Sequence, residues 1–143
     1  MDQICYRELK AYKYQLMQEY TIQTDIKPGK DLNFIFMSLT ENGMLTIRKG
    51  YAWDGPSGPT IDTPDFMRGS LVHDVLYQLM RLGALDYKIY RKRADEILRE
   101  ICLEDGMSAF RAWYVYQAVE WFGESFAKPN PEPEVVIICA PQK

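Results

Sequence analysis

Residues 63–106 read TPDFMRGSLVHDVLYQLMRLGALDYKIYRKRADEILREICLEDG, and this stretch decides the fold. On both sides of Gly83 its apolar residues recur at the spacing of an amphipathic helix. We expect one helix from Thr63 to about Leu82 and a second from about Tyr87 to Glu104. Because the connection through Gly83 is short, the two helices are predicted to lie antiparallel and adjacent.

The first of these helices has an apolar side and a polar side. The polar side carries His73, Asp74 and Tyr77. Tyr77 follows His73 by four residues, so the two side chains are neighbours on the helix surface. Gly69 precedes His73 by four residues and is expected to leave open space there. The apolar side is formed by Leu71, Val72, Val75, Leu76, Leu79 and Leu82.

Asp95 borders the apolar stripe of the second helix. The turn falls near the middle of the segment that separates His73 from Asp95, so an antiparallel pair brings them to similar heights. A carboxylate facing an imidazole fixes its tautomer and raises its basicity, as general-base catalysis requires. The sequence equally allows an ion pair between Asp95 and Arg91 or Arg99, and both interpretations stay open.

The first half of the chain is predicted to be β structure. The segment Tyr12–Ile26 is rich in Tyr, Thr and Ile, which favour strands. The runs Asn33–Leu39 and Met44–Lys49 flank the tetrapeptide Thr-Glu-Asn-Gly. Its Asn42-Gly43 pair favours a tight turn because both residues tolerate positive φ. The expected fold class is therefore α+β, with an antiparallel hairpin or sheet followed by a three-helix half.

We expect a single domain over all 143 residues. It divides into a mainly β part (1–49), a Gly/Pro-rich loop (50–63), a helical part (64–126) and a Pro-rich tail (127–143). The tail could add an edge strand at Val135–Cys139. The third helix, from Met107 to about Phe126, is rich in aromatic rings. It is expected to lie in the core, or to form a self-association face if the rings are exposed.

Charge and cysteine content exclude several classes of protein. A net charge of −3 gives no general attraction for nucleic acid, and the basic residues between Lys88 and Arg93 are interpreted as a solvated helix face. Three cysteines without metal-ligand spacing predict a reducing compartment and no disulfide framework. Neither a signal peptide nor a membrane-spanning run is visible. We expect a soluble protein.

Five short segments combine unusual residues at fixed spacing: WDGPSGP (53–59), DTPDF (62–66), SLVHDVLY (70–77), RKRADEIL (91–98) and WFG (121–123). Together they resemble a family of short bacteriophage and prophage proteins that is catalogued as domain of unknown function 1353. The similarity extends from about Gly50 to Gly123. It implies a phage or prophage origin, and with it the host cytoplasm or the virion as location, but no particular activity.

A second resemblance implies an activity. A Gly-rich loop, a helix with His73, Asp74 and Tyr77, and an antiparallel helix with Ala94-Asp95 are similar to the core of phospholipase A2. The disulfide-free form in parvovirus capsid proteins is the nearer comparison. In that family the His activates water, the adjacent Asp binds calcium, and the second-helix Asp orients the His. The resemblance implies these roles for His73, Asp74 and Asp95, with Tyr77 as support.

The resemblance also implies a calcium loop. Gly55 and Gly58 would lie in it, and backbone carbonyls plus the Asp74 carboxylate can begin the oxygen shell that calcium prefers. Asp54 could supply a further oxygen, although a turn role would also explain it. The loop departs from the family because Pro59 stiffens it and lacks a backbone N–H. Calcium is the only cofactor that the sequence suggests.

Two functional hypotheses follow. One is a calcium-assisted hydrolase of lipid or other ester substrates that aids membrane passage or lysis. The other is a non-enzymatic virion accessory or host-interaction protein, with a phage or host protein as partner. In that protein His73, Asp95 and Tyr77 would form a structural hydrogen-bond network. An enzyme requires His73 to line an open pocket with one nitrogen free, whereas a structural network requires both nitrogens to be satisfied and covered.

Overall fold

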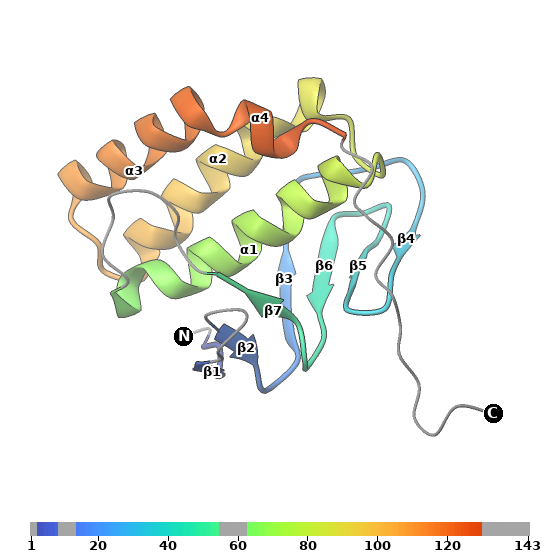
Figure 1. The fold of residues 1–143 in the computed structure, drawn as a ribbon, viewed down its shortest axis with the longest axis horizontal. Coiled ribbons are helices and arrows are strands. Elements are labelled where there is room, and N and C mark those ends of the chain that lie inside the picture. Colours follow the sequence, from blue (N-terminus) through green and yellow to red (C-terminus); the bar gives the residue numbers. More distant parts are fainter. Residues whose placement is uncertain (1–2, 9–13, 55–62, 130–143) are drawn as a thin grey trace.

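The computed structural model describes residues 3–8, 14–54 and 63–129 (Figure 1). Strands occupy the first half of the chain and helices the second, which confirms the α+β class. The Gly/Pro-rich segment 55–62 and the tail with its predicted edge strand lie outside the described residues. The strands are β1 (Tyr6–Glu8), β2 (Tyr14–Leu16), β3 (Tyr20–Gln23), β4 (Leu32–Asn33), β5 (Met37–Leu39), β6 (Met44–Ile47) and β7 (Ala52–Trp53).

The strands form two small antiparallel sheets. One has the order β1-β2-β7 and the other the order β3-β6-β5-β4. The segment Tyr12–Ile26, which was predicted to favour strands, contains β2 and β3 in its described part, and these two strands belong to different sheets. Strand β7 of the first sheet is linked to the helical half by Trp53, whose Nε1 donates to Ser70 Oγ.

The predicted hairpin exists as β5 and β6, which pair with Leu39 opposite Leu45. Its turn uses positive φ only at Gly43 (+92°), since no described residue other than glycine has positive φ. A three-residue loop ending in such a glycine explains the geometry, rather than the two-residue turn expected from Asn42-Gly43. The Gly43 N–H donates to the Thr40 carbonyl at 2.9 Å and closes the turn.

The run Asn33–Leu39 is not one continuous strand, because a turn at residues 34–36 separates β4 from β5. The Phe34 N–H donates to the Met37 carbonyl at 2.9 Å, and Arg48 holds the turn by donating to the Phe34 carbonyl at 2.7 Å. The split folds β4 back onto β5, and the buried Leu32 then lies opposite the buried Leu39. Burial of both leucines favours the turn over one continuous strand.

The helical half begins with the predicted antiparallel pair. Helices α1 (Pro64–Arg81) and α2 (Tyr87–Glu104) have the predicted bounds and pack against each other. Gly83 ends the first helix at φ +75°, a conformation that side chains other than glycine rarely adopt. The third helix is shorter than predicted: α3 (Ala109–Phe122) ends at Gly123, and α4 (Glu124–Ala127) is a separate turn of helix.

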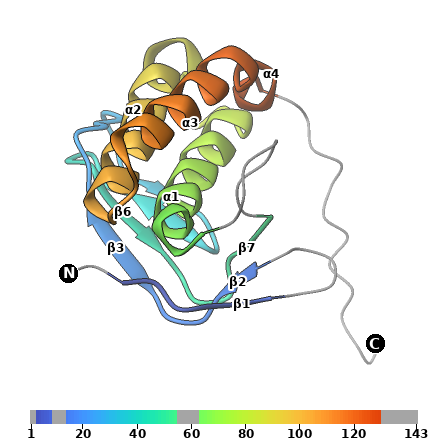
Figure 2. The same ribbon diagram turned by 90° about the vertical axis from the view of Figure 1, so that its left-hand side faces the viewer.

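Helix α1 occupies the centre of the molecule and is buried on nearly every side (Figures 1 and 2). The polar side is therefore largely covered, since Ser70, His73 and Tyr77 are all buried, whereas Asp74 is partly exposed. The apolar side meets the strands in the main hydrophobic core, with the exception of Leu82, which is exposed. Helix α2 packs against both α1 and α3. No helix within the described ranges is long and apolar enough to cross a membrane.

Arg68 was not selected in the sequence analysis, yet it ties the helices to a sheet. Its guanidinium is almost fully buried and donates to the Asp105 carboxylate at 2.8 and 3.0 Å and to the Tyr20 hydroxyl at 2.8 Å. Asp105 follows the last residue of α2, and Tyr20 begins β3. This buried ion pair fixes the relative positions of α1, α2 and β3, on which the geometry of the helix pair depends.

Candidate functional site

His73 and Asp95 meet between α1 and α2. The His73 Nε2 lies 2.7 Å from the Asp95 Oδ1, as the antiparallel arrangement predicted. Asp95 is fully buried and His73 is 7% exposed. Because a carboxylate accepts hydrogen bonds, Nε2 is the nitrogen that carries the hydrogen when the ring is neutral. Nδ1 is then the basic nitrogen of the imidazole.

Tyr77 completes the contact with Asp95. Its hydroxyl donates to the same Oδ1 at 2.7 Å, and its ring lies 4.1 Å from the His73 ring, centroid to centroid. Burial, and then the negative charge of Asp95, raise the pKa of Tyr77, so the hydroxyl remains a donor. Tyr77 therefore fixes both the carboxylate and one face of the imidazole.

Gly123, which follows the last residue of α3, lies too close to Tyr77 to carry a side chain. A Cβ atom on Gly123 would lie 2.5 Å from the Tyr77 hydroxyl oxygen and would also overlap the Val119 carbonyl. Any side chain at this position must therefore displace Tyr77 from Asp95 or distort the helix end. The WFG segment thus has a steric role in placing Tyr77, which its sequence did not reveal.

The second oxygen of Asp95 faces α3. Arg91 Nη1 lies 3.6 Å from Asp95 Oδ2, and Arg91 Nη2 lies 3.9 Å from Glu120 Oε2. The ion pair with Arg91 and the contact with His73 therefore coexist, although the sequence had offered them as alternatives. Arg91 was expected on a solvated face but lies largely buried between α2 and α3. No ion pair joins Asp95 to Arg99 among the described residues.

The pKa of His73 is raised. Burial, the largest single effect, lowers it, but the carboxylates of Asp74 and Asp95 stabilise the imidazolium and together outweigh burial. The Nδ1 atom lies 4.0 Å from Asp74 Oδ1, an ion-pair distance that is too long for a hydrogen bond. Within the described part of the chain, Nδ1 makes no hydrogen bond.

Asp74 and Asp54 carry the carboxylates that were predicted to bind metal. The Asp74 side chain is 36% exposed, unlike its neighbour His73. Its pKa is raised, first by desolvation and also by the negative charge of Asp54, while His73 and Arg81 act in the opposite direction. Because so much of the side chain is exposed, the desolvation is incomplete. The Asp54 carboxylate nevertheless lies close enough to Asp74 to repel its negative charge.

These two carboxylates fit a hard cation in type, since calcium prefers oxygen ligands. No group of three or more His, Cys, Asp or Glu side chains within residues 3–8, 14–54 and 63–129 could hold a metal ion. A complete shell would need further oxygens, and the predicted ligands Gly55 and Gly58 lie outside the described residues. The carboxylate of Asp65, at the start of α1, pairs with Arg111, with 3.2 Å between Oδ1 and Nη1.

Packing explains the roles of two further residues on α1 and β7. Gly69 does not leave open space near His73, because a Cβ there would lie 3.0 Å from both Cys102 Sγ and Leu98 Cδ1. It permits the close approach of α1 and α2 instead. Trp53 is buried, and its Nε1 donates to Ser70 Oγ at 3.3 Å. It anchors β7 to α1.

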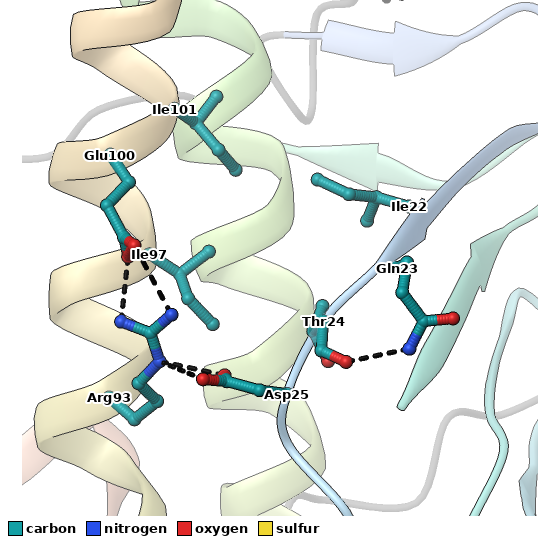
Figure 3. Close-up of a pocket in the computed structure, with 8 residues that line it drawn as sticks. All are labelled: Ile22, Gln23, Thr24, Asp25, Arg93, Ile97, Glu100 and Ile101. Atoms are coloured by element: carbon teal, nitrogen blue, oxygen red, sulfur yellow. Dashed lines mark hydrogen bonds and ion pairs between the residues drawn. The ribbon is translucent and has the colours of Figure 1, made fainter. Parts of the chain in front are cut away.

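A groove of about 390 Å³ lies between β3 and α2, on residues other than those of the His73 site (Figure 3). Arg93 lies at its edge, donating to the Asp25 carboxylate at 2.8 Å and to Glu100 at 2.7 Å. Ile22 and Ile97 supply its apolar lining. Because Arg93 is paired with these two carboxylates, it has little capacity to bind an anion. The groove contains no residue of the His73 site and adds nothing to its chemistry.

The aromatic rings of the third helix are mostly exposed, which contradicts the expected core position. Only Ala112 and Val115 of α3 are buried. The exposed rings on α3 and α4 are Phe110, Trp113, Tyr114, Trp121, Phe122 and Phe126. The self-association face, the interpretation kept for exposed rings, therefore remains a prediction.

Glu120 is the site residue that the sequence reasoning missed. It is the one acidic residue of α3, AFRAWYVYQAVEWF, and faces the Asp95–Arg91 pair. A single carboxylate among so many apolar residues was an available signal, because buried acidic side chains are almost always paired. Its partner on another helix could not be read from local spacing.

Comparison with known proteins identifies a family but no activity. The family model described as protein of unknown function (DUF1353) matches residues 32–119, more than half of the 143-residue chain. The chain belongs to this family. No curated protein and no solved structure shows significant similarity to it. The matched segment contains Trp53, His73, Asp74, Tyr77 and Asp95, whereas Glu120 and Gly123 follow its last residue.

Proposed function

We propose that this member of the DUF1353 family hydrolyses ester bonds, with lipid esters as a substrate class and His73 as the general base. The observation that carries the proposal is the 2.7 Å contact between His73 Nε2 and the fully buried Asp95 Oδ1. It leaves Nδ1 to accept a proton from a water molecule that attacks the ester carbonyl.

The surroundings of His73 suit this role. When Nδ1 takes a proton the ring becomes positively charged, and the adjacent Asp95 carboxylate stabilises that charge. Tyr77 holds the carboxylate by donating to it at 2.7 Å, so Asp95 need not reorient during the reaction. Asp95 and Tyr77 are positioning residues in this mechanism, because they act through His73 rather than on the substrate.

A calcium ion would be held by the Asp74 carboxylate, with Asp54 and the backbone oxygens of Gly55 and Gly58 as further ligands. The mutual repulsion of Asp54 and Asp74 supports a cation between them. When bound, calcium supplies a Lewis acid that polarises the ester carbonyl and stabilises the developing oxyanion. The phage origin, and a role in membrane passage or lysis, rest on the sequence resemblance.

The burial of His73 favours a second candidate, a non-enzymatic phage protein. Only 7% of the His73 surface is exposed, and none of the residues around the described groove belongs to the site. In this protein the contacts of His73, Tyr77 and Asp95 would serve only to join α1 to α2. The absence of catalysis and of calcium binding would distinguish this candidate from the hydrolase.

Calcium binding and calcium-dependent hydrolysis test the proposal together. We expect calorimetry to give a dissociation constant on the order of 10⁻⁴ to 10⁻³ M, the range of weak calcium sites. Asp74→Asn should abolish this binding and also the calcium-dependent release of acid from short-chain esters and phospholipid vesicles. Asp31→Asn is the matched control, since it removes the same charge from an exposed carboxylate. Equal responses of both variants, or no calcium response in the unmodified protein, would contradict the assignment.

A further inference from the structure

Two carboxylate oxygens at the α2–α3 interface are buried without a hydrogen-bond partner among the described residues. They are Asp95 Oδ2 and Glu120 Oε1. Both carboxylates lie next to the Arg91 guanidinium, at 3.6 Å for Asp95 and 3.9 Å for Glu120, and the two side chains interact with each other. A buried carboxylate oxygen without a donor is costly, so two of them around one guanidinium require an explanation. A single hydrogen shared between the two side chains would satisfy both oxygens.

Arg91 cannot neutralise both carboxylates on its own. Its Nη1 already donates to the Glu120 carbonyl at 3.2 Å and the Val119 carbonyl at 3.4 Å. Its distances to the two carboxylates exceed those of hydrogen bonds. Burial, and then the nearby Asp95, raise the pKa of Glu120 against the opposing charges of Arg91 and Lys92. One negative charge at this interface is therefore favoured over two.

The hydrogen bonds decide which of the two side chains is neutral. Asp95 Oδ1 accepts from both His73 Nε2 and the Tyr77 hydroxyl at 2.7 Å. Donors of this kind stabilise the ionised form of a carboxyl group. Glu120 has no comparable pair of donors among the described residues. The hydrogen therefore belongs on Glu120, and the negative charge on Asp95.

We propose that Glu120 is a neutral carboxylic acid whose Oε1–H donates to Asp95 Oδ2, which makes it a positioning residue for the His73–Asp95 pair. Asp95 is then held on both oxygens, by His73 and Tyr77 on one side and by Glu120 on the other. The shared hydrogen does not depend on catalysis. Its effect on turnover rests on the proposed function.

The direction of the pH dependence follows from the raised pKa of Glu120. The folded protein retains a hydrogen that the unfolded chain loses near the ordinary Glu pKa of about 4.3. The stabilisation is therefore complete below that pH and is lost as the pH rises through the folded-state pKa. Above it, a second buried negative charge faces Asp95. The charged or titratable groups around Glu120 are Arg91, Lys92 and Asp95 on α2 and Tyr116 on α3. Glu96 and Arg99 of α2 act on Tyr116, and Tyr77 of α1 donates to Asp95. Glu124 on the packed α4 is more than half exposed.

The test compares Glu120→Gln with Glu124→Gln, an exposed control. The amide of Glu120→Gln can still donate to Asp95 but cannot ionise, so we expect its stability to exceed that of the unmodified protein increasingly as the pH rises. The infrared carbonyl band of a protonated carboxyl group should be present at neutral pH in the unmodified protein and the control, and lost in Glu120→Gln. An unchanged band, or the same pH dependence of unfolding in all three proteins, would overturn the proposal.

Turnover provides a readout that a purely structural role would not change. If Glu120 positions Asp95, Glu120→Gln should keep activity to higher pH than the unmodified protein, and Glu120→Ala should lower kcat more than it changes KM. Identical pH profiles for the unmodified protein and Glu120→Gln would overturn the positioning role. If the protein shows no hydrolysis, the infrared and unfolding experiments still decide whether the hydrogen is shared.

Discussion

Replacing Asp95 by alanine is expected to lower the free energy of unfolding by about 3–5 kcal/mol, the cost of breaking a buried charged contact from one side. The change removes the acceptor for His73 Nε2 and for the Tyr77 hydroxyl, both buried. It also leaves the guanidinium of Arg91 without the nearer of its two carboxylates. The His73 nitrogen and the Tyr77 hydroxyl would then be buried without their acceptor.

Urea unfolding followed by Trp fluorescence measures this loss. Asp95→Asn should cost about 1–2 kcal/mol, because its amide oxygen still accepts a hydrogen bond although the charge is gone. Asp25→Ala is the control, since Asp25 pairs with Arg93 at an exposed position where an ion pair contributes about 1 kcal/mol or less. If Asp95→Ala and Asp25→Ala lower the free energy of unfolding by the same amount, the buried network does not hold the helices together.

Replacing His73 by glutamine is expected to reduce ester hydrolysis by about 10²- to 10⁴-fold, the usual contribution of a general base. The glutamine amide can donate to Asp95 and so replace the structural contact of Nε2, but it cannot take a proton from water. The loss should appear in kcat, measured on short-chain esters and phospholipid vesicles at saturating calcium. KM should change little.

Retained calcium binding is the internal control for this variant. Asp74 and Asp54 are unchanged, so His73→Gln should bind calcium with the affinity of the unmodified protein and unfold at a similar urea concentration. Full activity of His73→Gln would contradict the general-base role. Loss of both calcium binding and folding would instead point to the structural interpretation of the network.

The helix pair and the meeting of His73 with Asp95 could be predicted because both follow from local rules. Apolar spacing fixed the two helices, and Gly83 fixed the short turn between them. Once two helices are antiparallel and adjacent, residues equally distant from the turn must lie near each other. Only the rotation of each helix about its own axis remained undetermined. The 2.7 Å contact shows that His73 and Asp95 both face the interface between the two helices.

The surroundings of α1 could not be predicted, because they depend on residues far away in sequence. A helical wheel separates apolar from polar residues, but it does not say that a polar side faces other helices instead of water. Gly69 looked like open space because Leu98 and Cys102 of α2 fill that space from another element. Arg68 gave no sign that Asp105 and Tyr20 would enclose it.

The prediction that the aromatic rings of the third helix lie in the core was wrong for a different reason. Aromatic residues usually lie in cores, yet α3 has apolar residues on all sides and only one narrow face against α2. The rings on the remaining faces are exposed because no described element covers them. Glu120 was missed because its significance depends on the position of Asp95 across the α2–α3 interface.

The tautomer of the imidazole tests the central claim most directly. The chain contains one histidine, so the ¹⁵N and ¹H signals of the ring belong to His73 without ambiguity. At a pH above the His73 pKa, the nitrogen shifts should show the hydrogen on Nε2, held by Asp95, and Nδ1 without one. A neutral ring with its hydrogen on Nδ1, or an averaged mixture of both forms, would contradict the arrangement on which the proposed base depends.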